Sequence, residues 1–238
     1  MPSLPKPDHR SRVGAERRER MRARLVECAL TVFAERGVGA SVIQEVIATA
    51  GVSQGSFYNH FRTNEELLIA VAEELNNELI AHIEGVVHRH EDPAMRLAAG
   101  VRLYLHRAGR YPLFARFIVA AGFHLVSPNN LLYEYVPPHL EAGMQTGRLR
   151  PMPMELGIDL VGGLALAAIA RLSSGEAPAD YPEQVAQALL TALGLSPQEA
   201  GPIAHAPLER LADSGDSLIA RATARARAST QTAPASQG

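Results

Sequence analysis

The stretch Ser41–Phe61, SVIQEVIATAGVSQGSFYNHF, decides the fold of this chain. Apolar residues recur in its first half at four-residue spacing: Val42, Val46 and Ala50. That spacing predicts a short helix with one buried face. Gly51 follows where this helix must end, because the residue after a helix C-terminus often needs a positive φ. Ser53 is a favourable N-cap, so a second helix is expected to begin directly after it.

The second helix of this stretch has a buried side and a small polar side. Phe57 and Phe61 lie one turn apart and are expected to anchor it in the core. Its other positions carry short or polar side chains: Gln54, Gly55, Ser56, Tyr58, Asn59 and His60. A short helix with such an outer face, held at an angle by a glycine turn, is typical of a helix-turn-helix that binds DNA.

Charge is distributed unevenly along the chain. The net charge of the 238 residues is −2, but residues 1–62 contain ten Lys or Arg and six Asp or Glu, a net charge of +4. The remaining residues carry a net charge of −6. A basic N-terminal part on an acidic body is the asymmetry expected when one end of a protein meets phosphate.

An arginine-rich helix is predicted to precede the helix-turn-helix. It is expected to begin at Glu16 and to end at Gly37, after a mobile arm over residues 1–15. Arg17 and Arg18 lie in its first turns and are candidates for phosphate contact. A solvated helix face, in which Glu16 and Glu19 pair with the arginines, explains the same pattern equally well.

Composition bounds the class of protein. Hydrophobic residues make up 47% and charged residues 20%, which is ordinary for a soluble globular chain. Cys28 is the only cysteine, so an internal disulfide is impossible. No apolar run reaches the length of a membrane span and no signal peptide is visible, so a cytoplasmic location without membrane contact is expected. No His or Cys spacing suggests a metal site, no cofactor is expected, and no catalytic motif suggests an enzyme.

The rest of the chain is predicted to be all-α. Helices are expected over 64–90, 95–107, 113–123, 131–146, 154–172 and 181–193, with a kink or a fresh start at Pro137-Pro138. No segment shows a convincing strand pattern. We therefore expect a DNA-binding domain over 16–63, a larger helical domain over 64–210, and a disordered tail over 211–238.

The N-terminal motifs resemble those of the TetR family of bacterial transcriptional regulators. The resemblance covers roughly residues 18–75 and lies in the FAERG ending of the first helix and in AGVSQGSFYNHFRTNEELL at residues 50–68. This chain has Gln54 and Asn64 where the family often has lysines that can touch phosphate. Gln54 could instead bind an adenine edge with two hydrogen bonds.

Candidate DNA contacts follow from the resemblance and from side-chain chemistry. Gly55 allows a close backbone approach, and Ser41 stands at a helix N-terminus, where backbone N–H groups favour phosphate. The full candidate set is Arg17, Arg18, Ser41, Ser53, Gln54, Gly55, Ser56, Tyr58, Asn59 and His60.

The resemblance also implies an effector pocket and a dimer. A small-molecule pocket is implied within the helices from 93 to about 175, with candidate residues Arg102, Tyr104, His106, Phe114, Phe117, Phe123, His124 and Tyr133. The helices at 154–172 and 181–193 would form a homodimer interface. Gly162-Gly163 and nearby alanines would allow close helix packing there, although packing within one chain is an alternative.

The sequence thus favours a ligand-responsive repressor that binds a palindromic operator in double-stranded DNA as a homodimer. The alternative is a constitutive or architectural DNA-binding protein without an effector. A core without a cavity in the C-terminal half would favour that alternative.

Overall fold

The computed structural model describes residues 9–39, 42–122 and 129–232, and these contain helices without any strand. The N-terminal helices are α1 (His9–Arg36), α2 (Val42–Ala50) and α3 (Gln54–Tyr58). The next are α4 (Asn64–Val87), α5 (Pro93–Arg110), α6 (Pro112–Ala121) and α7 (Leu132–Gln145). The last are α8 (Met154–Ser174), α9 (Tyr181–Ala192), α10 (Pro197–Ala204) and α11 (Leu218–Thr232). The predicted all-α class is confirmed.

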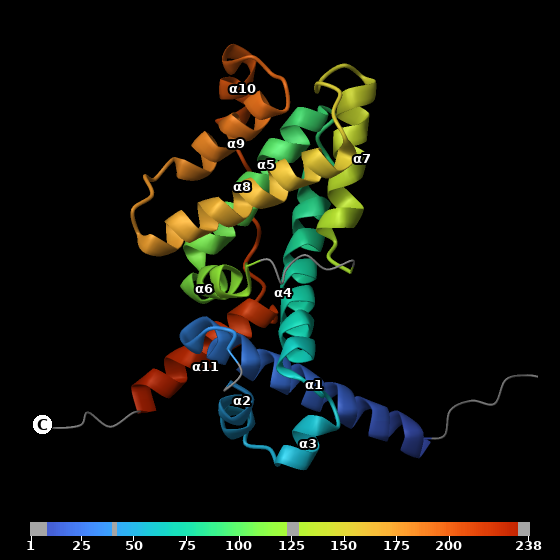
Figure 1. The fold of residues 1–238 in the computed structure, drawn as a ribbon, viewed down its shortest axis with the longest axis vertical. Helices are drawn as coiled ribbons and strands as arrows, with labels where there is room; N and C mark the ends of the chain where they lie inside the picture. The colour runs from blue at the N-terminus through green and yellow to red at the C-terminus, as the bar shows by residue number, and fades with distance from the viewer. Residues whose placement is uncertain (1–8, 40–41, 123–128, 233–238) are drawn as a thin grey trace, which may run out of the picture.

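Helix α4 joins the two ends of the molecule. Its N-terminal half rises from the small bundle of α1, α2 and α3, and its C-terminal half lies among α5, α7 and α8 (Figure 1). Thr63 caps it by accepting a hydrogen bond from the Glu66 backbone N–H at 3.0 Å. Leu67, Val71, Leu75, Leu79 and Ile83 repeat along one side and are buried. The hydrophobic core is therefore continuous from the N-terminal bundle to the C-terminal bundle.

Helix α1 begins earlier than the sequence suggested. It starts at His9, so residues 9–15, which were expected to belong to a mobile arm, are helical. No proline interrupts this segment, and Arg12 forms an i, i+4 pair with Glu16 at 3.8 Å, which supports the extra turns. Residues 1–8 of the expected arm lie outside the described residues.

The C-terminal segment is a second correction. Residues 218–232 form α11 instead of the disordered tail that was expected over 211–238. Leu218, Ile219 and Ala222 are buried, and α11 packs on α1, α4 and α6. The Arg225 Nε donates to the Glu27 carboxylate of α1 at 2.7 Å. An Ala- and Arg-rich composition was mistaken for disorder, although its few apolar residues fall on one helical face.

Two smaller differences concern prolines. Helix α7 continues through Pro137 and Pro138, where a kink or a fresh start was predicted. Helix α10 was not predicted, although Ser196 and Glu199 cap each other reciprocally at its start. Neighbouring helices hold both segments, since α7 packs on α5 and α8, and α10 packs on α5 and α9.

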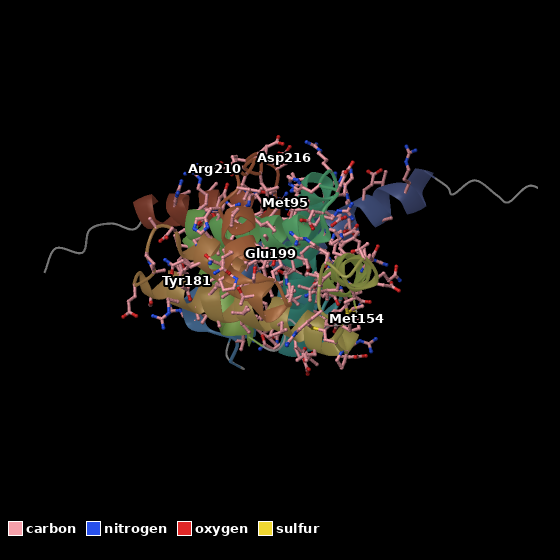
Figure 2. The ribbon with its side chains drawn as sticks, turned by 90° about the horizontal axis from the view of Figure 1, so that it is seen from above. Met95, Met154, Tyr181, Glu199, Arg210 and Asp216 are labelled. Atoms are coloured by element: carbon pink, nitrogen blue, oxygen red, sulfur yellow. The ribbon has the colours of Figure 1, made fainter. Side chains whose placement is uncertain are left out.

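Helix α8 lies across the C-terminal bundle. It packs on α5, α6, α7 and α9, and Figure 1 shows it running diagonally in front of α5. Seen from above, Met154 and Tyr181, the first residues of α8 and α9, stand on opposite sides of the molecule (Figure 2). Among the described residues, α8 is the one helix long and apolar enough to cross a membrane, a test that the core helix of a soluble protein also passes.

Candidate DNA-binding face and ligand cavity

The turn between α2 and α3 has the geometry that the sequence predicted. Gly51 has a φ of 62°, which a residue with a side chain rarely adopts. The Val52 N–H donates to the Ile47 carbonyl at 3.2 Å and closes the end of α2. Ser53 then caps α3 by accepting a hydrogen bond from the Ser56 N–H at 3.2 Å. The hydroxyl of Ser53 is therefore engaged in the cap.

Helix α3 is anchored from below by aromatic rings. Phe57 and Phe61 are buried, with ring centroids 6.1 Å apart, and the Arg22 guanidinium lies 5.6 Å from the Phe61 ring. Backbone bonds from Asn59, His60 and Phe61 continue the helical turn past Tyr58. This short helix is rigid because its inner face is completely packed.

The outward face of α3 is largely exposed, although the Tyr58 ring packs edge-on against Phe57 with centroids 5.4 Å apart. Gln54, Gly55 and Asn59 are exposed, and Tyr58 is 44% exposed. A Cβ placed on Gly55 would meet no atom within 4 Å. The face can therefore come close to a partner without any rearrangement of the helix. Six of the predicted contact residues lie together on this helix and its C-terminal turn, namely Gln54, Gly55, Ser56, Tyr58, Asn59 and His60.

Helix α1 brings arginines to the same end of α3. Burial, followed by the positive charges of Arg18 and Arg22, lowers the pKa of His60 below its ordinary value. Arg17 and Arg18 have exposed side chains, as the sequence suggested for phosphate contacts. Arg22 differs, because it pairs with Glu74 of α4 at 3.2 Å. Ser41 lies outside the described residues.

Asn64 has a structural role that the sequence did not indicate. Its side-chain amide donates to the Val38 carbonyl at 2.9 Å and to the Gly39 carbonyl at 3.3 Å. It thus fastens the chain after α1 to the start of α4.

A cavity of about 400 Å³ lies inside the C-terminal bundle. Its wall is formed by α4, α5, α7 and α8, with contributions from α6 and the segment before α7. Most of the wall is apolar. Its polar residues include two hydrogen-bonded pairs: Tyr104 donates to the Asn76 side-chain oxygen at 2.7 Å, and His139 Nε2 lies 2.9 Å from the Glu84 carboxylate.

Only part of the predicted effector set lines this cavity. Tyr104 and Tyr133 do. Arg102 and His106 instead contact the Glu183 carboxylate of α9 at 3.0 and 3.2 Å. Neither residue lines this cavity, and their expected contact with an effector stays a prediction.

The predicted aromatic residues are also distributed differently. Phe114 is buried and packs edge-on against Tyr104 with centroids 5.5 Å apart. Phe117 is buried against Phe33 of α1 at 6.4 Å, so it belongs to the core that joins the two bundles. Phe123 and His124 lie outside the described residues. The cavity residues Asn76, Glu84, Arg96 and His139 were missed, because no local motif links positions on three different helices.

Two family models match most of the chain. The model described as "Bacterial regulatory proteins, tetR family" matches residues 25–71, and "Tetracyclin repressor-like, C-terminal domain" matches residues 92–206. The first match contains α2 and α3, and the second contains the helices that form most of the cavity wall. The matches leave out the α4 residues that line the cavity, as well as Arg17 and Arg18.

Curated relatives agree with these models. The chain is 32% identical over 69 residues to the uncharacterized regulator YvdT of Bacillus subtilis, covering 29% of this chain and 36% of YvdT. It is 27% identical over 154 residues to the transcriptional repressor KstR2 of Mycobacterium tuberculosis, covering 59% and 73%. The chain spans only 36%, 17% and 38% of the lengths of YvdT, YerO and the repressor DhaR.

A solved structure resembles most of the described fold. The regulator RolR, crystallised with its ligand resorcinol, superposes with a TM-score of 0.68 at 29% identity. The superposition covers 83% of this chain and 100% of RolR. Together with the two family models, this likeness extends from the helix-turn-helix to the C-terminal bundle. The chain belongs to the TetR family of bacterial transcriptional regulators.

Proposed function

We propose that this protein is a ligand-responsive repressor that binds a palindromic operator as a homodimer. The single observation that supports it best is that α4 belongs to both candidate sites. Its first half packs on α1 and carries Glu74, the partner of Arg22. Its second half carries Asn76 and Glu84, which line the cavity. A ligand in the cavity can therefore favour one position of α4, and with it one position of α3.

The exposed face of α3 is proposed to enter the major groove. Gly55 lets the backbone approach, Gln54 and Asn59 can hydrogen-bond to base edges, and Arg17 and Arg18 of α1 can neutralise phosphates. Tyr58 and His60 stand at the flanks, where phosphates are expected. Family relatives include proteins named as repressors, which supports this sign of regulation.

A homodimer is proposed through α8 and α9. Leu156 of α8 is 45% exposed, and Gly163, Ala167 and Ala170 are exposed along the same side of that helix. An apolar, small-residue face of this kind is suited to close packing against a second copy. Two copies would present two α3 helices to half-sites one helical turn apart or a multiple of it. Regulators of this family are typically dimers in the cytoplasm, and we propose the same location here.

The constitutive alternative is less well supported. It predicted a C-terminal core without a cavity, and the described residues line a partly open one of about 400 Å³. We therefore propose that a ligand in the cavity regulates DNA binding by changing the spacing of the two α3 helices.

Footprinting of the DNA that flanks the protein's own gene tests this proposal. The protein should protect two half-sites, sediment as a dimer at micromolar concentration, and lose the footprint with at least one member of a metabolite panel. A monomer in ultracentrifugation would contradict the proposal. Protection of DNA without preference for any sequence would also contradict it. Distances between spin labels on α3 in the two protomers test the spacing mechanism, which fails if a releasing compound leaves that distance unchanged.

A further inference from the structure

Glycines in the middle of α5 and α8 keep the cavity open. Gly100 and Gly162 both line it, and neither has a positive φ. A Cβ on Gly100 would lie 3.8 Å from Ile83, and one on Gly162 would lie 3.8 Å from Leu132, which are ordinary contacts. Glycine in a helix interior is unfavourable relative to alanine. Neither backbone conformation nor packing within the described part of this chain explains these two glycines.

Two other helical glycines are required by close packing. A Cβ on Gly143 would lie 2.4 Å from the Leu149 side chain, and one on Gly157 would lie 2.8 Å from Leu140. Both residues are buried and do not line the cavity. Gly143 and Gly157 are therefore needed for close packing, whereas Gly100 and Gly162 contribute only empty space inside the bundle.

The polar groups of the cavity stand at its two ends. Asn76 is 3% exposed and bonds Tyr104 through its side-chain oxygen. Glu84 and Arg96 are each eight residues nearer the turn between α4 and α5, so they stand about 12 Å further along the helices. Between the two ends the lining of α4 and α5 is aliphatic.

Both ends have unused hydrogen-bonding capacity. The Asn76 amide nitrogen has no hydrogen-bond partner within the described ranges. His139 is 7% exposed and bonds Glu84 through Nε2, while its Nδ1 has no partner among the same residues. Buried polar groups are normally paired. The Asn76 amide nitrogen therefore points to an oxygen-bearing ligand that accepts its hydrogen bond, whereas His139 Nδ1 is fully covered and does not face the open space.

The charges around the cavity disfavour an anion. Among the described residues, Arg96 is the one Lys or Arg in the lining, and its Nε donates to the His90 carbonyl at 2.5 Å. Glu84 and Asp159 also line the cavity and are carboxylates. Transfer of a further negative charge from water into this mostly aliphatic space, beside two carboxylates, is costly.

We infer that the effector is a neutral, largely apolar small molecule with hydrogen-bonding oxygen, and that Gly100 and Gly162 determine its size by leaving the room that it occupies. This rests on the proposed function, since it assigns the ligand class of the cavity of that regulator. It goes further because it names the two residues that set which members of the class fit.

A matched pair of fluorescent probes tests the inference on the full-length dimer. N-phenyl-1-naphthylamine is neutral, and 8-anilinonaphthalene-1-sulfonate is nearly the same molecule with a negative charge. The neutral probe should bind the wild type with one site per chain and at least about ten-fold more tightly than the sulfonate, a difference of about 1.4 kcal/mol. Equal or tighter binding of the sulfonate would overturn the neutral class.

Variants of the glycines test their role. Gly162→Leu should lower the affinity for the neutral probe at least ten-fold. The variant protein should still give the operator footprint. Unchanged probe binding by a folded Gly162→Leu protein would overturn the assignment. If the wild-type protein gives no operator footprint, the proposed function is contradicted. The binding of the two probes still tests the ligand class of the cavity.

Alanine variants keep the test decisive if the leucine variant fails to fold. Gly100→Ala and Gly162→Ala should raise the melting temperature, because alanine favours the helix and the added methyl meets no clash. Gly143→Ala and Gly157→Ala should lower it. If Gly162→Ala lowers the melting temperature as Gly157→Ala does, the glycine serves packing and the inference is wrong.

Discussion

The side-chain amide of Asn64 donates to the Val38 carbonyl oxygen at 2.9 Å, and this bond holds the segment after α1 against the first turn of α4. A second bond, to Gly39 at 3.3 Å, completes the contact. Asn64, which stands where the family often has a lysine, therefore has a structural role. It stabilises the contact between the segment after α1 and α4, but it lacks the positive charge of a lysine.

Asn64→Lys should lower the stability of the fold and strengthen the electrostatic part of DNA binding. Loss of the two hydrogen bonds should lower the free energy of unfolding by about 1–2 kcal/mol in urea denaturation. A new phosphate contact should steepen the salt dependence of DNA binding by about one counterion. Gln54→Lys is the matched control, because it adds the same charge on α3 without a bond to lose, and it should keep its stability. A variant Asn64→Lys as stable as the wild type would contradict this role.

Gln54→Ala should separate base recognition from phosphate contact. If Gln54 bonds an adenine edge, the variant should lose about 1–3 kcal/mol of binding to the operator and little on random DNA. Fluorescence anisotropy with both DNA duplexes at one salt concentration measures the difference. Equal loss on the two duplexes would show that Gln54 does not recognise a base.

His60 should make DNA binding depend on pH. Burial and then the charges of Arg18 and Arg22 lower its pKa, so the free protein holds this side chain neutral near pH 7. A nearby phosphate would raise the pKa, so binding would take up a proton and affinity should rise as pH falls from 8 to 6. His60→Gln should flatten that profile. An unchanged slope in His60→Gln would place the proton elsewhere.

The same group should affect folding with a definite sign. A histidine whose pKa is lowered in the folded state remains neutral there while the unfolded chain takes up a proton. Stability should therefore be lost as pH falls below the ordinary histidine value, and His60→Gln should lose less of it in urea titrations. The opposite trend would mean that His60 gains a partner on folding.

The helix-turn-helix could be predicted from sequence because its signals are local. Gly51, Ser53, Phe57 and Phe61 each act within a few residues, and the structure gives each the role that its type suggested. The cavity could not be predicted in the same way. Glu84 and His139 are 55 residues apart and meet only through the packing of α7 on α4.

The tail shows a different limit of sequence reasoning. Residues 218–232 have few apolar side chains, so composition suggested disorder. Leu218 and Ile219 are nevertheless enough to hold α11, because α1, α4 and α6 already offer a surface for them. Whether such a segment folds depends on the rest of the molecule, which a local pattern does not contain.

Helix α11 should stabilise the DNA-binding bundle. Removal of residues 217–238 should lower the free energy of unfolding by about 3 kcal/mol or more, because Leu218 and Ile219 lose their burial. The partly exposed pair of Arg225 and Glu27, 2.7 Å apart, should contribute about 0.5–1 kcal/mol in a double-mutant cycle. A truncated protein with unchanged urea midpoint would show that α11 adds nothing to stability.

The central claim is that the outer face of α3 binds DNA, and Gly55→Leu tests it most directly. A Cβ at this position meets no atom within 4 Å and the position is exposed, so the fold and melting temperature should remain close to those of the wild type. The account predicts that anisotropy titration of the operator shows a loss of about 100-fold, because the leucine holds the backbone away from the groove and several base contacts of about 1 kcal/mol each are lost. A folded Gly55→Leu protein that binds the operator as tightly as the wild type would contradict the account.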